Sequence, residues 1–163
     1  MRKLLCAAVA AASAFAPAAN AACWTAEPAD AARVRDLQSF LMVETLRCSA
    51  IGFNISSHYN AFVRGNRAAL GTANDRLKSF FIRSAGPVYG QTAYDRFTTR
   101  LANTYGASPT DADTCDHARS VAAEAAQMDN DMEGLMMIAD RQGLEPDLPG
   151  GLCSRNSVAV REH

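Results

Sequence analysis

Apolar residues recur at helical spacing along most of the chain from residue 25 onward. They stand three and four positions apart, which indicates one buried stripe on each helix. No stretch shows the sustained alternation that marks a half-buried strand. The pattern therefore predicts an all-α fold, a compact bundle of about five to six helices. At this length we expect a single helical domain over residues 22–154.

Interruptions in the apolar pattern divide the chain into six predicted helices. Glycine and proline clusters, and a helix-start signal at Ser108-Pro109-Thr110-Asp111, mark their ends. The predicted helices span about 28–48, 55–65, 67–83, 88–104, 111–128 and 130–141. The first is apolar on nearly every side around residues 40–43, which is typical of a central helix. Prolines and glycines over 143–151 predict a closing loop, followed by a flexible tail at 155–163.

The first 21 residues have the pattern of an export signal. Arg2-Lys3 precedes an uncharged run from Leu4 to Ala16, and Ala19-Asn20-Ala21 supplies the small residues that a signal peptidase requires. The run is too short to cross a bilayer, and no second such stretch follows. We therefore expect removal of residues 1–21 by cleavage after Ala21, and no membrane span.

The composition of the chain indicates which partners and which kind of source organism to expect. Without Arg2-Lys3 the formal net charge falls from −1 to −3, and basic residues are scattered among acids. Nucleic-acid binding, which needs clustered cations, is therefore not expected. Beyond residue 21 the chain holds thirteen arginines, the single lysine Lys78 and many alanines, a bias typical of GC-rich bacterial genes. The expectation is a bacterial protein of the periplasm, or a secreted one.

Four cysteines follow the predicted cleavage site: Cys23, Cys48, Cys115 and Cys153. An even number in an exported chain predicts two disulfides, and no Cys-x-x-Cys motif indicates redox activity. A first helix would hold Cys23 and Cys48 roughly 30 Å apart, which is too far for a bond. The remaining pairings are Cys23–Cys153 with Cys48–Cys115, which we favour, or Cys23–Cys115 with Cys48–Cys153. A lipid on Cys23 is disfavoured because Asn20 replaces the usual leucine-like residue.

Glu44 falls inside the apolar arc of the first predicted helix. A carboxylate there must be paired or protonated, because an isolated buried charge is very costly. One hypothesis makes Glu44 a general acid or base together with His58, which lies on the inward face of the second helix. The other, which we favour, is an internal ion pair with an arginine such as Arg47 or Arg64, with His58 a hydrogen-bonded core residue.

An acidic segment resembles the calcium loop of an EF-hand. The ligands would be Asp129, Asp131, Glu133 and Asp140. The match is partial, because the last position lacks the bidentate glutamate and Gly143 leaves no room for the helix that should follow. Acids in the first turn of a helix explain the segment better.

Three methionines, Met128, Met132 and Met136, follow one another at four-residue spacing. Their thioethers are possible copper(I) ligands, which would need His117 or another ligand close by. The same spacing is typical of core packing, which we favour. We expect no cofactor.

The common hydrolase, metalloprotease and nucleotide-binding motifs are absent from the sequence. We therefore favour a non-catalytic, inhibitor-like module that binds a protein or a cell-envelope component. The alternatives are a small periplasmic enzyme using Glu44 and His58, or a metal-binding protein. An exposed apolar or aromatic patch involving Trp24, Phe53 or Tyr89 would support the binding module, and a pocket holding both Glu44 and His58 would support the enzyme. The pattern does not indicate an oligomeric state.

Overall fold

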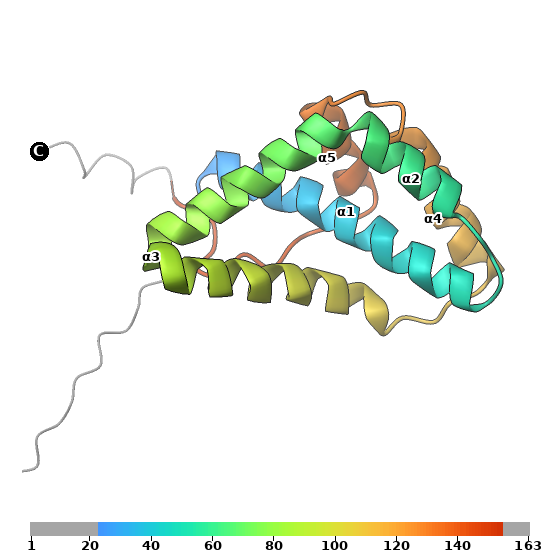
Figure 1. The fold of residues 1–163 in the computed structure, drawn as a ribbon, viewed down its shortest axis with the longest axis horizontal. Helices are drawn as coiled ribbons and strands as arrows, with labels where there is room; N and C mark the ends of the chain where they lie inside the picture. Colours follow the sequence, from blue (N-terminus) through green and yellow to red (C-terminus); the bar gives the residue numbers. More distant parts are fainter. Residues whose placement is uncertain (1–22, 155–163) are drawn as a thin grey trace, which may run out of the picture.

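A computed structural model describes residues 23–154 of the chain. These residues form five α-helices and no β-strand beyond one isolated bridge, so the all-α prediction is confirmed (Figure 1). The helices are α1 (Ala26–Ala50), α2 (Ser56–Gly65), α3 (Arg67–Gly106), α4 (Ala112–Ala125) and α5 (Met132–Arg141). The predicted export signal with its cleavage site, and the predicted tail at 155–163, lie outside the described residues.

The central helix is α1, as its apolar middle predicted. It runs between two arms of α3, while α2, α4 and α5 cover the rest of its surface (Figure 1). Leu37 and Leu41 are fully buried on it, and Cys48 is buried near its end. Because almost every other element packs on α1, the side chains that α1 presents decide how the bundle is assembled.

A sharp bend divides α3 into two arms. Gly86 leaves the helical conformation with φ +78° and ψ 167°, a region that glycine adopts without strain, and Pro87 follows it. The predicted break between the helices at 67–83 and 88–104 is therefore confirmed, although the chain reverses at Gly86 without a separate loop. Gly90 lets the arms close, because a Cβ there would lie 2.6 Å from the Ile82 Cα. The result is a tight helical hairpin.

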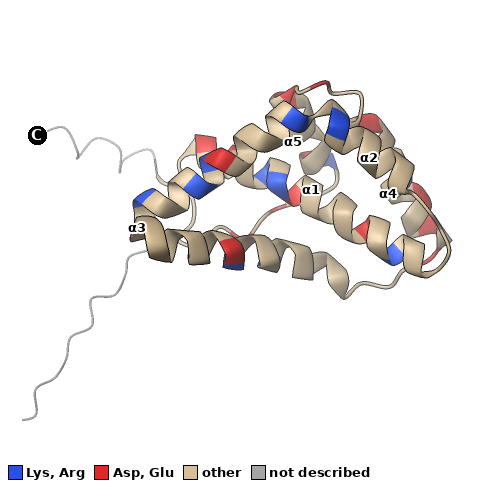
Figure 2. Cartoon of the chain, viewed as in Figure 1, with Lys and Arg blue, Asp and Glu red and all other residues tan. Residues whose placement is uncertain are grey.

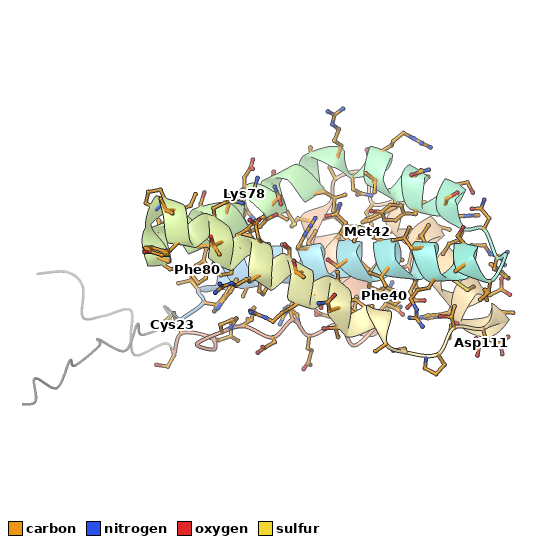
Figure 3. All side chains as sticks on the ribbon, turned by 60° about the horizontal axis from the view of Figure 1, so that its bottom comes forward. Cys23, Phe40, Met42, Lys78, Phe80 and Asp111 are labelled. Carbon is orange, nitrogen blue, oxygen red and sulfur yellow. A yellow bond between two sulfur atoms is a disulfide. The ribbon has the colours of Figure 1, made fainter. Side chains whose placement is uncertain are left out.

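Trp24 fills the apex of this hairpin. Its ring lies 4.1 Å from Phe80 and 5.5 Å from Phe81 on the first arm, and 5.4 Å from Phe97 on the second, between ring centroids. The indole Nε1 donates a hydrogen bond to the Pro149 carbonyl at 2.9 Å, so both its apolar and polar parts are satisfied. Figure 3 places Phe80 near Cys23, at the end of the molecule where α3 bends.

The last described residues are fastened beside Trp24. The Trp24 amide donates to the Gly151 carbonyl at 2.8 Å, and the Cys153 amide donates to the Trp24 carbonyl at 2.9 Å. These bonds form a parallel bridge between Trp24 and Leu152. The segment from 143 onward is therefore a closing strap, as its glycines and prolines predicted.

Two disulfides join Cys23 to Cys153 and Cys48 to Cys115, with Cα–Cα distances of 4.8 Å and 5.7 Å. This is the pairing that the sequence favoured. The first bond closes the strap at the hairpin apex, and the second joins the end of α1 to α4. Since the Cys23 sulfur is bonded to Cys153, it has no valence left for a lipid thioether. None of the described helices is long and apolar enough to span a membrane.

We expect the double variant Cys23→Ser/Cys153→Ser to lose about 4 to 5 kcal/mol of unfolding free energy, because the bond closes a loop of 130 residues. Urea denaturation followed by circular dichroism measures the loss. The matched control, Cys48→Ser/Cys115→Ser, should lose a similar amount because loop entropy varies only with the logarithm of length. Only the first variant should shift Trp24 fluorescence, and an unchanged spectrum would show that the bond does not hold the apex.

Candidate functional site

Glu44 forms an ion pair with Arg47. The Arg47 Nη1 donates to Glu44 Oε1 at 2.7 Å and to the Tyr105 carbonyl at 2.6 Å, while Nη2 donates to the Ser108 carbonyl. Arg47 thus ties the second half of α1 to the end of α3. Burial raises the pKa of Glu44, and Arg47 acts in the opposite direction by favouring the charged form. The other oxygen, Oε2, is buried and has no hydrogen-bond partner among the described residues.

The structure does not join His58 to Glu44. His58 is half-buried on α2, and its Nδ1 lies 3.3 Å from the Ser57 hydroxyl. Within residues 23–154 no hydrogen bond or ion pair connects His58 with Glu44, and none connects Arg64 with Glu44. Neither Glu44 nor His58 lines the surface hollows beside Glu27, Asp36, Arg33 and Thr92. Among the described residues, neither a hydrogen bond nor any of these four hollows brings Glu44 and His58 together.

A second buried carboxylate, Asp36, lies on α1. It is 2% exposed and accepts a hydrogen bond from the Tyr105 hydroxyl at 2.8 Å. Burial raises the pKa of Asp36 to about 6, although the Tyr105 hydrogen bond acts to lower it. Asp36 and Tyr105 border a small hollow of about 130 Å³ that is also lined by Phe97, Arg100 and the strap residues 145–147. Tyr105 therefore joins the second arm of α3 to α1, beside a hollow that the strap also borders.

In the acidic segment that resembles a calcium loop, Asp131 and Asp140 make structural contacts. Asp131 is the N-cap of α5 and accepts from the Glu133 amide at 3.1 Å. Asp140 lies 3.8 Å from the Arg33 guanidinium. Asp129 adopts a positive φ of 45° in the turn before α5. Among the described residues no group of three or more acids, histidines or cysteines is arranged to hold a metal ion.

The turn at residues 129–130 also holds the junction of α2 and α3. Asn66 is fully buried there, and its Nδ2 donates to the carbonyls of Phe62 and Ala125. Its Oδ1 accepts from the Asn130 amide at 3.0 Å. The Asn130 Oδ1 in turn accepts from two amides in the first turn of α3 and so caps that helix. These bonds give the asparagines of the segment a structural role in holding α2, α3 and the turn before α5 together.

The methionine stripe packs against the core. Met128, Met132 and Met136 are all partly buried against the main hydrophobic cluster. His117, the extra ligand that copper would need, has its Nε2 2.6 Å from the Gln142 side-chain oxygen. Core packing accounts for this spacing, as the sequence favoured, and the copper hypothesis finds no support in the arrangement.

The largest exposed apolar side chains on α3 gather at its bend. Val88 and Tyr89 are 75% and 77% exposed, and Ile82, opposite them on the first arm, is 40% exposed. Ala85 and Pro87 between them are exposed as well. We call these five residues the apolar tip. Single exposed apolar residues are ordinary, but five within eight positions at the end of one hairpin form a patch.

The charges near the apolar tip are positive. From residue 76 to residue 94 the chain holds Arg76, Lys78 and Arg83 and no acid, and Figure 2 shows no red at the bend itself. Glu27 pairs with Arg76 at 3.0 Å, and the Lys78 ammonium lies 5.5 Å from the Tyr94 ring centroid. Arg83, next to the tip, is exposed and has no ion pair among the residues described.

Of the three aromatic residues whose exposure would support a binding module, only Tyr89 is exposed. Trp24 is 1% exposed and belongs to the core. Phe53 is half-buried beneath the Arg119 guanidinium at 5.8 Å. Tyr89 stands with Val88 and Ile82, which the sequence did not single out.

Comparison of the chain with protein-family models, curated proteins and solved structures finds no match. Function must therefore be inferred from the residues themselves.

Sequence reasoning missed Asp36 and the apolar tip. Asp36 falls four residues after the buried Ala32, on the same side of α1, so helical periodicity could have identified it. The tip carried a weaker signal: an apolar run directly after Gly86-Pro87, where polar turn residues are usual. Neither pattern by itself shows whether the residue is buried or exposed, because that depends on how the arms of α3 pack.

We expect Arg47→Met and Glu44→Gln each to lower the unfolding free energy by about 1 to 4 kcal/mol, with Arg47→Met the larger loss. Loss of Arg47 leaves a buried carboxylate and two carbonyls without their donor, whereas loss of the Glu44 charge leaves Arg47 its carbonyl acceptors. Urea titrations at pH 7 measure both. A Glu44→Gln protein as stable as the wild type would contradict a structural ion pair.

The raised pKa of Asp36 should make stability depend on pH. Between the unfolded value near 3.9 and about 6 the folded state binds more protons, so the penalty for the charged carboxylate disappears as the pH falls. Relative to Asp36→Asn, the wild type should gain about 2 to 3 kcal/mol of stability from pH 7.5 to pH 4. Comparing the two proteins isolates Asp36, and a difference that stays constant with pH would refute this assignment.

Proposed function

We propose that the chain is an exported, non-catalytic binding module that attaches to a component of the bacterial cell envelope through the apolar tip of α3. Residues 1–21 are the export signal, and the periplasm or the cell exterior is the place of action. The observation that carries the proposal is the exposure of Val88, Tyr89 and Ile82 together at the bend. Such clustering on a small protein typically marks an interaction site.

The rigidity of the hairpin supports a binding role. The aromatic cluster around Trp24 lies directly beneath the bend, and at Gly90 the two arms approach backbone to backbone. A site held in place before binding loses little conformational entropy when its partner arrives. Two disulfides add to this order and are suited to an oxidising compartment.

The enzyme alternative has less support, because the two carboxylates of α1 are engaged in structural bonds. Glu44 faces Arg47, and Asp36 accepts from Tyr105. The first bond holds Arg47 where it also donates to the Tyr105 carbonyl, and the second joins α1 directly to the second arm of α3, so both carboxylates serve the packing of these helices.

The proposal is tested by exporting the full chain from a bacterial host and separating the envelope from the released contents. We expect Val88→Ser/Tyr89→Ser to reduce envelope retention by on the order of tenfold, because two apolar side chains lose their contact. The matched control is Leu46→Ser, since Leu46 is 66% exposed on α1, away from the bend. Equal retention of all three proteins would refute a role for the tip.

A further inference from the structure

We propose that the component bound by the apolar tip is the lipid surface of a membrane with anionic headgroups, into which the tip inserts. This inference rests on the proposed function and names the partner class. Three features of the hairpin carry it: the size of the patch, the charges around it and the chemistry of its side chains.

The patch is too small for a stable protein–protein interface. It consists of five side chains at the projecting end of a hairpin (Figure 1), whereas such an interface uses roughly 20 to 30 residues on each side. A dimer formed through the tip would also have too small an interface, because a symmetric contact pairs one small patch with another. A lipid surface has no such requirement, since it flows around whatever apolar group enters it.

The charges beside the tip complement anionic headgroups. Arg83 lies within the tip segment, and Lys78 precedes Ile82 by one helical turn. The nearest acids along α3 are Asp75 and Asp95, each at least six residues from the tip, and Glu27 is paired with Arg76. Cations next to an apolar segment attract anionic lipids at short range, within about one Debye length of roughly 10 Å. The net excess is small, so the electrostatic contribution should be modest.

The side chains of the tip suit the boundary between headgroups and acyl chains. Val88, Pro87 and Ile82 are aliphatic, and Tyr89 combines an apolar ring with a hydroxyl that favours the interface. The tip contains no acid, whose insertion would be costly. With no helix that spans a bilayer among the described residues, attachment would be peripheral.

The experiment measures co-sedimentation of the mature, disulfide-bonded chain with lipid vesicles. One set contains phosphatidylglycerol and phosphatidylcholine in equal parts, and the other contains phosphatidylcholine alone. We expect the wild type to bind the anionic vesicles, and Val88→Ser/Tyr89→Ser to raise the apparent Kd on the order of tenfold. Arg83→Gln should weaken binding to anionic vesicles severalfold and leave binding to neutral vesicles unchanged. Leu46→Ser should stay within about twofold of the wild type.

Two further readings make each outcome decisive. Trp24 is the only tryptophan and lies under the tip, so its unchanged emission shows that each variant is folded. A Val88→Trp protein should show a blue shift that is larger with anionic vesicles than with neutral ones at the same lipid concentration. Failure of the wild type to bind these vesicles, or equal binding by the tip variant, overturns the lipid proposal. If envelope retention still depends on the tip, the partner is an envelope protein or glycan and the binding module stands; without tip dependence, both proposals fall.

Discussion

The burial of Trp24 between the two arms of α3 is the interaction on which the rest of the structure depends. The indole contacts aromatic rings on both arms, and its backbone hydrogen-bonds to the strap that ends at Cys153. Remove the ring, and the arms lose the side chain that sets their separation, while the strap loses its attachment. The Cys23–Cys153 bond is placed directly beside this contact, so covalent and apolar forces act on the same apex.

At the other end of the second arm, buried polar groups take the place of the aromatic cluster. The Tyr105 hydroxyl donates a hydrogen bond to Asp36, and its backbone carbonyl accepts one from Arg47. Its ring packs edge to face on Phe40. Burying Asp36 and Glu44 is unfavourable in itself, as the raised pKa of each shows. A shift of the second arm along α1 would break the bonds of Tyr105 to Asp36 and Arg47 and leave buried polar groups unpaired, which is costly. The aromatic contacts of Trp24 hold the two arms of α3 together, and the polar bonds of Tyr105 hold the end of the second arm against α1.

The contacts of Trp24 and Tyr105 lie inside the molecule and leave the bend of α3 exposed. Both arms are held from within, at Trp24 and at Tyr105, so the exposed side chains of Val88 and Tyr89 contribute little to keeping the hairpin closed. Val88 and Tyr89 are 75% and 77% exposed, yet they are apolar, and the charges next to them along α3 are cations. We propose that this composition serves attachment to a lipid surface, which would suit both the apolar and the cationic parts.

The sequence by itself determined the features that arise locally or from simple geometry. Helical periodicity, the break at Gly86-Pro87, the cap at Asp111 and the exclusion of a Cys23–Cys48 bond all depend on neighbouring residues or on helix length. It also identified Glu44 as an inward carboxylate, whose partner Arg47 lies only three residues away. Tertiary structure alone decided that Trp24 is core and Tyr89 is surface, and that Asp36 meets a tyrosine 69 residues later. The physical reason is that burial is a property of two surfaces in contact, and here the second surface belongs to a distant part of the chain.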